Sequence, residues 1–308
     1  MHRAWIRVSV LLASLSAASC DTESAAPAGS GGTLTGGTPA VGGASGGAVG
    51  GSAQGGSPSG GTAVCPSPAC TNPTEQNRVC EDADTISLGK YQVLNNLWGA
   101  AGTASTDGQC SYSLCNTSSA IAWGTDYTWT SGDAISVKSY AAVILGWHWS
   151  TINAASQLPV QLSAGRDVNC TWSFRVASDA NASQNVAYDL WLYTSSNVGI
   201  RTQPTDEIMV WLYRINKDDP IGTYQTAVTL DGIEWDLYRG QNGTTNVFSF
   251  LSRTNRTCAT LNLMDFLDDL VGRTWIQNTK YLISVEAGTE LVRGTGSVDT
   301  DYYSCSVQ

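Results

Sequence analysis

The sequence predicts an all-β fold in which two antiparallel sheets pack face to face, with one short helix. From residue 75 onward, short runs of alternating apolar and polar residues are separated by clusters of Gly, Asn, Asp and Ser, as expected for strands with tight connections. A single segment has helical spacing. Glycine is enriched outside this part of the chain, since 15 of the 32 glycines fall between residues 21 and 64. Two stacked sheets are the simplest architecture for so many short strands.

Residues 1–20 are typical of an export signal. Arg3 and Arg7 give a basic start, and the apolar run at 8–18 is too short to span a bilayer. The run ends in Ala-Ala-Ser-Cys, which resembles the lipobox of bacterial lipoproteins except that Ala stands where Leu is usual. Two interpretations stay open, a lipid anchor at Cys20 or ordinary cleavage near Ala18. Both predict a protein that is secreted or anchored at the cell surface.

Residues 21–74 are expected to form a flexible linker. The stretch from 25 to 62 contains Gly, Ser, Ala, Thr and Pro without charges, so it cannot bury enough apolar surface to offset its ordering entropy. The folded part is therefore predicted to be a single domain at 75–308, which we expect to be monomeric.

The strands of this domain are expected wherever apolar and polar residues alternate. The candidate segments are 87–94, 134–143, 171–176, 186–193, 207–215, 222–230, 233–239, 245–251 and 281–287. The stretch from Cys110 to Trp129 is too irregular to assign.

A helix is predicted at 261–271, where Leu263, Phe266, Leu267 and Leu270 share one face. Asn262 lies near its start and Gly272 just beyond its end. A helix this short is expected to pack against the outside of a sheet.

Charge and cysteine content exclude several classes of protein. The formal net charge is -10, which disfavours nucleic acid as a partner. Only two histidines are present, which argues against a histidine-rich zinc site or a Ser-His-Asp hydrolase. Apart from Cys20, eight of the nine cysteines could form up to four disulfides, and a zinc interpretation of the two C-x4-C spacings is weak in an exported chain. We expect neither a metal nor a cofactor.

Tryptophan is abundant, with 11 residues, and several alternate with polar side chains. In a strand, Glu207, Met209 and Trp211 would share one face. A face that mixes a carboxylate with indoles suits sugar binding, since aromatic faces stack on pyranose rings and carboxylates accept their hydroxyls. The alternative is that most of these tryptophans are core. Trp98 and Trp147 are further candidates for sugar contact.

Five motifs together resemble glycoside hydrolase family 12, the small endo-β-1,4-glucanases, in order and approximate spacing. They are Asn-Asn-Leu-Trp-Gly at 95–99, Val-Ala-Tyr-Asp-Leu-Trp-Leu at 186–192, Glu-Ile-Met-Val-Trp at 207–211, Pro-Ile-Gly at 220–222 and Ser-Val-Glu-Ala-Gly-Thr-Glu at 284–290. The resemblance implies a β-jelly roll with a concave cleft, a retaining double-displacement mechanism, β-1,4-linked glucan as substrate and a Cys80–Cys110 disulfide.

The resemblance also implies roles for individual residues. Glu207 is similar to the nucleophile, Glu290 to the general acid/base and Asp189 to the auxiliary carboxylate of the family. The implied substrate-binding residues are Asn96 and Trp98 as sugar contacts, Met209 and Trp211 as cleft floor, and Pro220 in a loop across the cleft. A retaining enzyme needs its two carboxyl groups about 5–5.5 Å apart.

Several alternatives stay open. Glu286 lies four residues before Glu290 and is its rival as acid/base. Arg293 could contact substrate or form a salt bridge. The favoured function is endo-acting hydrolysis of β-1,4-glucan, with mixed-linkage glucan, soluble cellulose derivatives or xyloglucan as substrate. The alternatives are a xylanase of the related jelly-roll family and a non-catalytic glucan-binding protein, although the latter predicts loss of one of the two glutamates, Glu207 or Glu290.

Overall fold

The computed structural model describes residues 65–148, 151–152, 154–199 and 202–308. The predicted export signal, Cys20 and the linker up to residue 64 lie outside these ranges. No helix within the described ranges is long and apolar enough to cross a membrane.

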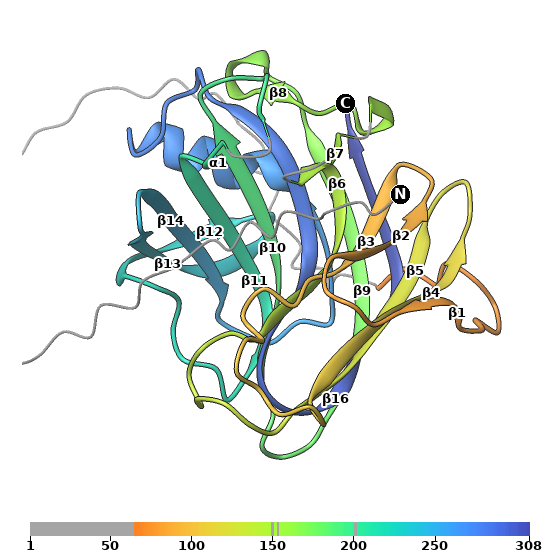
Figure 1. Cartoon of the computed structure of the whole chain (residues 1–308). Coiled ribbons are helices and arrows are strands. Elements are labelled where there is room, and N and C mark those ends of the chain that lie inside the picture. The colour runs from red at the N-terminus through yellow and green to blue at the C-terminus, as the bar shows by residue number, and fades with distance from the viewer. Residues whose placement is uncertain (1–64, 149–150, 153, 200–201) are drawn as a thin grey trace, which may run out of the picture. The chain divides into compact units, whose positions relative to one another are not determined.

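The strands form two sheets that share one long strand, β16 (Figure 1). The larger sheet has the order β2 (Asp84–Leu88), β3 (Tyr91–Asn95), β6 (Ser139–His148), the first half of β16 (Tyr281–Val307), β10 (Ser183–Tyr193), β11 (Asp206–Ile215), β14 (Thr245–Ser252), β13 (Ile233–Asn242) and β12 (Thr223–Leu230). The smaller sheet has the order β1 (Gln76–Val79), β4 (Gly108–Asn116), β5 (Ile121–Trp129), the second half of β16, β9 (Val168–Ser178) and β15 (Cys258–Asn262).

Short elements complete the edges. β7 (Thr151–Ile152) pairs with β6, β8 (Val160–Gln161) pairs with β16, and two 3-10 turns lie at Ala154–Ser156 and Leu162–Ala164. Strands β11 and β14 pair in parallel, whereas the other pairs in the described residues are antiparallel. The predicted antiparallel arrangement therefore holds except at this one pair.

Large aromatic side chains pack the two sheets together. Trp172 of β9 meets Tyr188 of β10 edge-on, with ring centroids 5.1 Å apart, and it also contacts Tyr303 of β16. Its indole Nε1–H donates to Thr300 Oγ1 at 3.0 Å, so the buried polar atom is satisfied. Apolar residues of both sheets surround this contact in one continuous core. The predicted all-β sandwich is confirmed.

Strand β16 changes sheet in its middle. It pairs with β6 and β10 as far as Arg293, and from Gly294 it pairs with β5 and β9. Gly294 has a φ of +99°, and a Cβ there would lie 2.4 Å from the Cα of Ala182. The crossing therefore requires glycine. The sequence prediction ended this strand at 287, just before Gly288 and Thr289, which interrupt the apolar alternation.

The helix, α1, spans Leu263–Gly272. Asn262 caps it by accepting a hydrogen bond from the Met264 backbone N–H, as its position near the start suggested. Phe266 packs edge-on against Trp235 of β13 and Phe250 of β14, so the helix covers one face of the larger sheet. The predicted start at 261 is two residues early, because Leu261 and Asn262 pair with β9.

Two other strand predictions need correction, and strands β4 and β5 were missed. The segment 87–94 is a hairpin of β2 and β3 that turns at Gly89, which has a φ of +65°. The segment predicted at 134–143 starts instead at Ser139, because Asp133 accepts backbone hydrogen bonds from Ile135 and Ser136 and so holds a turn. Strands β4 and β5 were not predicted, since their polar residues interrupt the alternation.

Four disulfides join the eight cysteines between residues 65 and 308: Cys65–Cys258, Cys70–Cys115, Cys80–Cys110 and Cys170–Cys305. The Cys80–Cys110 pairing is confirmed, and both C-x4-C pairs bond to partners elsewhere, so the zinc interpretation is wrong. Cys65 and Cys70 attach residues 65–74 to the folded domain. The boundary predicted at 75 therefore falls inside the covalently attached segment.

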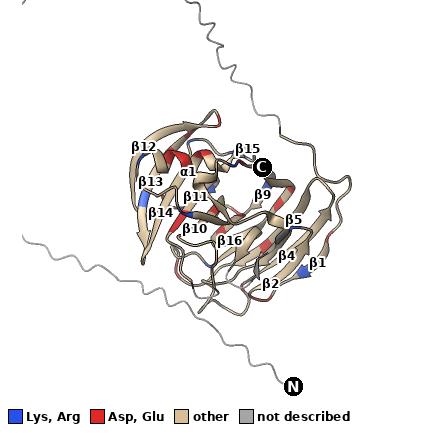
Figure 2. Ribbon diagram, turned by 90° about the horizontal axis from the view of Figure 1, so that it is seen from above, with Lys and Arg blue, Asp and Glu red and all other residues tan. Residues whose placement is uncertain are grey.

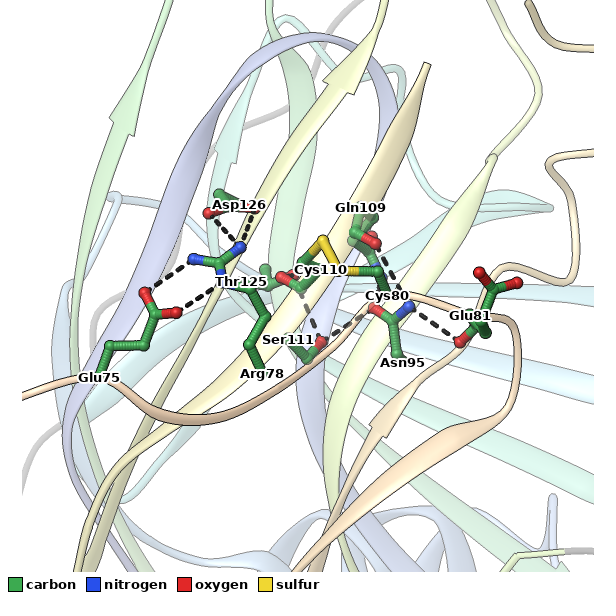
Figure 3. Close-up of a disulfide and its surroundings, with 10 residues drawn as sticks. All are labelled: Glu75, Arg78, Cys80, Glu81, Asn95, Gln109, Cys110, Ser111, Thr125 and Asp126. Carbon is green, nitrogen blue, oxygen red and sulfur yellow. Dashed lines mark hydrogen bonds and ion pairs between the residues drawn. A yellow bond between two sulfur atoms is a disulfide. The ribbon is translucent and has the colours of Figure 1, made fainter. Parts of the chain in front are cut away.

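The Cys80–Cys110 bridge lies beside a buried amide network at the end of β3 (Figure 3). The Asn95 side chain donates to the carbonyls of Glu81 and Gln109, and its Oδ1 accepts from Ser111 and Gln109. Every hydrogen-bonding capacity of this buried amide is used. The bridge and the network together fix the point where the chain leaves β3 and enters the segment with Asn96 and Trp98.

Candidate active site

The candidate catalytic side chains lie on one face of the larger sheet. Asp189 of β10 is opposite Met209 of β11 on one side and Glu286 of β16 on the other, and Trp191 is opposite Glu207. The alternate residues Leu190, Ile208, Val210 and Val285 are buried in the core between the sheets. Because side chains alternate along a strand, the carboxylates lie on the face that points away from this core.

Asp189 is buried among the other carboxyl groups. Within the described residues its Oδ1 has no hydrogen-bond partner. Burial raises its pKa well above the usual range, and the charges of Glu207, Glu290 and Glu286 raise it further. The raised pKa favours the protonated form of Asp189, whose O–H can donate to a neighbouring carboxylate.

Glu207 lies at the edge of this cluster and is half-buried. Burial raises its pKa to about 8, with further contributions from the charges of Glu290 and Glu286. The pKa values of Glu207 and Asp189 are therefore both raised by burial and by the neighbouring carboxyl groups.

Glu290 is held by Asn185, which is opposite it on β10. The Glu290 backbone N–H donates to Asn185 Oδ1 at 3.0 Å, and Asn185 Nδ2 donates to Glu290 Oε2 at 2.5 Å. The Lys217 ammonium lies 3.5 Å from the same Oε2. These contacts fix the orientation of a carboxyl group that remains partly exposed.

Neither Asn185 nor Lys217 was identified from the sequence. Asn185 could have been, since residues 185, 187, 189 and 191 share one strand face. Lys217 lies in the loop after β11, where no periodicity predicts the direction of a side chain.

Glu286, the rival acid/base, is enclosed. It is 1% exposed, and its Oε1 contacts His148 Nδ1 at 2.8 Å and accepts a hydrogen bond from Ser284 Oγ at 3.1 Å. A general acid must reach the oxygen that it protonates. Glu290, with the more exposed side chain, meets this requirement better than Glu286.

The aromatic candidates differ in exposure. Trp98 is 54% exposed, and its backbone N–H donates to Asn96 Oδ1. The Asn96 carbonyl accepts from the backbone N–H of Tyr140, which is the neighbour of Glu290 in β6. Asn96 and Trp98 therefore lie at the Glu290 end of the carboxylate cluster.

The other predicted sugar contacts are less accessible in the structure. Trp211 is 2% exposed, and its indole N–H points to the sulfur of Met209 at 3.4 Å. Trp147 is 3% exposed and packs edge-on against Tyr193. Pro220 is buried ahead of β12.

Gly222 lies in a tight turn, whereas Arg293 lies at the surface. Gly222 after Pro220 has a φ of +99° and lies against the Arg239 carbonyl, where a Cβ would approach to 2.1 Å, so the turn requires glycine. Arg293 is exposed, and it forms no ion pair with any residue that the structure describes.

The comparisons with known proteins agree with this geometry. The model of glycosyl hydrolase family 12 matches residues 89–308. Endoglucanase S of Pectobacterium parmentieri is 34% identical over 238 residues, which are 74% of this chain and 86% of that protein. The xyloglucan-specific endo-beta-1,4-glucanase A of Emericella nidulans is 36% identical over 239 residues, 76% and 92% of the two chains. The native family 12 xyloglucanase from Bacillus licheniformis superposes with a TM-score of 0.69 at 32% identity, over 75% of this chain and 100% of that one.

The sandwich, the carboxylates on the face that points away from its core and these relatives together identify a glycoside hydrolase. The chain belongs to glycosyl hydrolase family 12 and is an enzyme of the endoglucanase type.

Proposed function

We propose that the protein hydrolyses internal β-1,4 bonds of a glucan with retention of anomeric configuration. The observation that carries the proposal is the difference between the carboxyl groups on one sheet face. Asp189 is buried with its pKa raised well above the usual range, Glu207 lies beside it, and Glu290 is oriented by Asn185 with part of its side chain exposed.

In this mechanism the ionised form of Glu207 attacks the anomeric carbon while the protonated form of Glu290 donates its proton to the leaving oxygen. The C–O bond of the glycosidic link breaks and an ester bond forms between Glu207 and the sugar. Asp189, which keeps its own proton, donates a hydrogen bond to Glu207 and so favours its ionised form. Glu290 then takes a proton from water, which attacks the ester and releases Glu207.

Substrate binding is assigned to the same face. Asn96 and Trp98 would contact sugars at the Glu290 end, Met209 and Trp211 would form the floor, and the loop at Pro220 would border it. Trp147 is buried against Tyr193, so its contribution would be to support the neighbouring Trp191.

Xyloglucan is the first substrate to test. The Emericella nidulans relative is named as xyloglucan-specific and the Bacillus licheniformis structure as a xyloglucanase, both at 32% identity or more. Mixed-linkage glucan and soluble cellulose derivatives are the comparison substrates. Hydrolysis of xylan would support the xylanase alternative. Retention on cellulose without hydrolysis would support the binding-protein alternative.

Export from the cytoplasm completes the proposal. Four disulfides in the described residues fit an oxidising compartment. We propose that residues 1–20 direct export, that residues 21–64 act as a tether and that the domain works as a monomer. Labelling with a radioactive fatty acid, with Cys20→Ser as control, distinguishes a lipid anchor from ordinary cleavage near Ala18.

The test of catalysis is Glu207→Gln. The amide is nearly isosteric with the carboxylate but cannot form the sugar ester. We expect no reducing-sugar release from xyloglucan or barley β-glucan and an unchanged circular dichroism spectrum. Retention of more than about a tenth of wild-type activity would contradict the role of Glu207, because loss of a covalent nucleophile costs far more than tenfold.

A further inference from the structure

The loop between β11 and β12 carries a lysine onto the catalytic face. The Lys217 side chain is 11% exposed, and its ammonium lies 3.5 Å from Glu290 Oε2 and 5.4 Å from the centroid of the Trp211 ring. The predicted cleft-floor indole is therefore covered by a cation next to the acid/base.

Hydrogen bonds on both sides hold this loop in place. Asn216 Nδ2 donates to the Ala182 carbonyl at 2.9 Å, and Arg214 Nη1 donates to Asp219 Oδ1 at 2.7 Å. The Arg214 guanidinium also reaches the Lys217 carbonyl at 3.5 Å. The backbone on either side of Lys217 is thus anchored, which sets the direction of its side chain.

The position of Glu290 limits the distance from Lys217 to substrate. A general acid must lie within about 3 Å of the oxygen that it protonates. An ammonium 3.5 Å from Glu290 Oε2 therefore lies within about 9 Å of the oxygen of the cleaved bond, whichever carboxyl oxygen donates the proton. Substituents on the sugars that flank the bond come within its reach.

We propose that Lys217 forms an anion-accepting subsite beside the cleaved bond, so that the enzyme binds β-glucan chains with carboxylate substituents through this residue. The inference rests on the proposed function of the same face. An ammonium has three donors, so Lys217 can pair with Glu290 Oε2 and still donate to a second anion. When Glu290 carries the proton that it must donate, Lys217 loses its anionic neighbour and its charge can pair with the substrate.

The negative charges nearby make the binding of an anionic glucan depend strongly on Lys217. Glu290 and Glu286 lie on the same face, acidic residues occur on strands of both sheets (Figure 2), and the chain as a whole carries a formal net charge of -10. The nearby Arg214 is already paired with Asp219. Without Lys217, this face would repel a carboxylated glucan.

The test measures binding without turnover, in the Glu207→Gln background. Affinity electrophoresis compares gels with carboxymethyl cellulose and with hydroxyethyl cellulose, which share a backbone and differ in charge. Lys217→Met keeps an unbranched side chain over Trp211 and removes the charge. We expect the affinity ratio of the charged to the neutral polymer to fall by about two- to fivefold, as for a partly exposed ion pair. Lys217→Arg should restore it.

The controls separate this subsite from general charge effects. Lys90→Met changes the net charge equally at a lysine that contacts the Cys305 carbonyl, and it should leave the ratio unchanged. The preference of the Lys217 protein should also weaken at 1 M salt, where the Debye length is about 3 Å. A ratio that is the same in Lys217→Met and in the parent would overturn the proposal. Absence of hydrolysis by the wild-type enzyme would contradict the proposed function instead, because the binding ratio does not depend on turnover.

Discussion

Replacing Asn185 by Ala tests whether the acid/base is held as the structure indicates. The substitution removes the amide that donates to Glu290 Oε2 at 2.5 Å and accepts from the Glu290 backbone N–H at 3.0 Å. A hydrogen bond to a charged group contributes about 1.5–3 kcal/mol. If that amount is lost in the transition state, kcat on a natural glucan should fall about 10- to 100-fold.

The same substitution should also lower stability. The Glu290 backbone N–H would lose its partner in a half-buried position, which costs about 1–3 kcal/mol. Urea denaturation would measure this loss. Activity must therefore be assayed well below the unfolding transition, so that the fall in kcat is not caused by unfolding.

The choice of substrate separates positioning of the acid from general damage. An aryl glycoside with an activated leaving group needs little proton donation, so its kcat should fall by less than about threefold. Asn197→Ala, at an exposed residue in the loop after β10, is the matched control and should have no effect. Equal losses on the polymer and on the aryl glycoside would refute the assignment of Asn185 as a positioning residue.

Three further predictions concern the carboxylates and the N-terminal bridge. Glu290→Ala should strongly reduce hydrolysis of natural glucan and largely spare a substrate with an activated aryl leaving group, and azide should restore part of its rate. Glu286→Ala should not show this pattern. Azide rescue of Glu286→Ala would assign the acid/base role to Glu286 instead. The pKa of Glu207 is raised to about 8, so between about pH 4.5 and 8 the folded state binds more protons than the unfolded state. The free energy of unfolding should therefore fall as pH rises, by at most about 1.4 kcal/mol per pH unit. In urea denaturation Glu207→Gln should flatten this slope, and an unchanged slope would count against the raised pKa. Replacing Cys80 and Cys110 by Ser opens a loop with a sequence separation of 30 residues and should lower stability by about 3–4 kcal/mol, and an unchanged midpoint would show that the bridge contributes nothing.

The sequence was sufficient where side chains follow strand alternation. It placed Glu207, Met209 and Trp211 on one face, and the register of β10 with β11 agrees. The same rule applied from Asp189 back to Asn185 would have found the partner of Glu290. The face could be predicted because its two-residue period does not depend on the rest of the fold.

Long-range features could not be predicted in the same way. β16 continues to Val307 because Gly294 lets it cross from one sheet to the other, although glycine at that place resembles a turn signal. The burial of Trp147 depends on Tyr193, and the position of Lys217 depends on loop contacts with Ala182 and Asp219. Three disulfide pairings also depended on tertiary proximity, since eight cysteines allow 105 arrangements.

The most direct test of the central claim is the configuration of the first product. Proton NMR during hydrolysis of a xyloglucan or cello-oligosaccharide resolves the α- and β-anomers before mutarotation equilibrates them. If Glu207 forms a covalent intermediate that Glu290 helps water to hydrolyse, the β-anomer should appear first. Initial release of the α-anomer would mean that water attacks directly, and it would contradict the assignment of Glu207 as nucleophile.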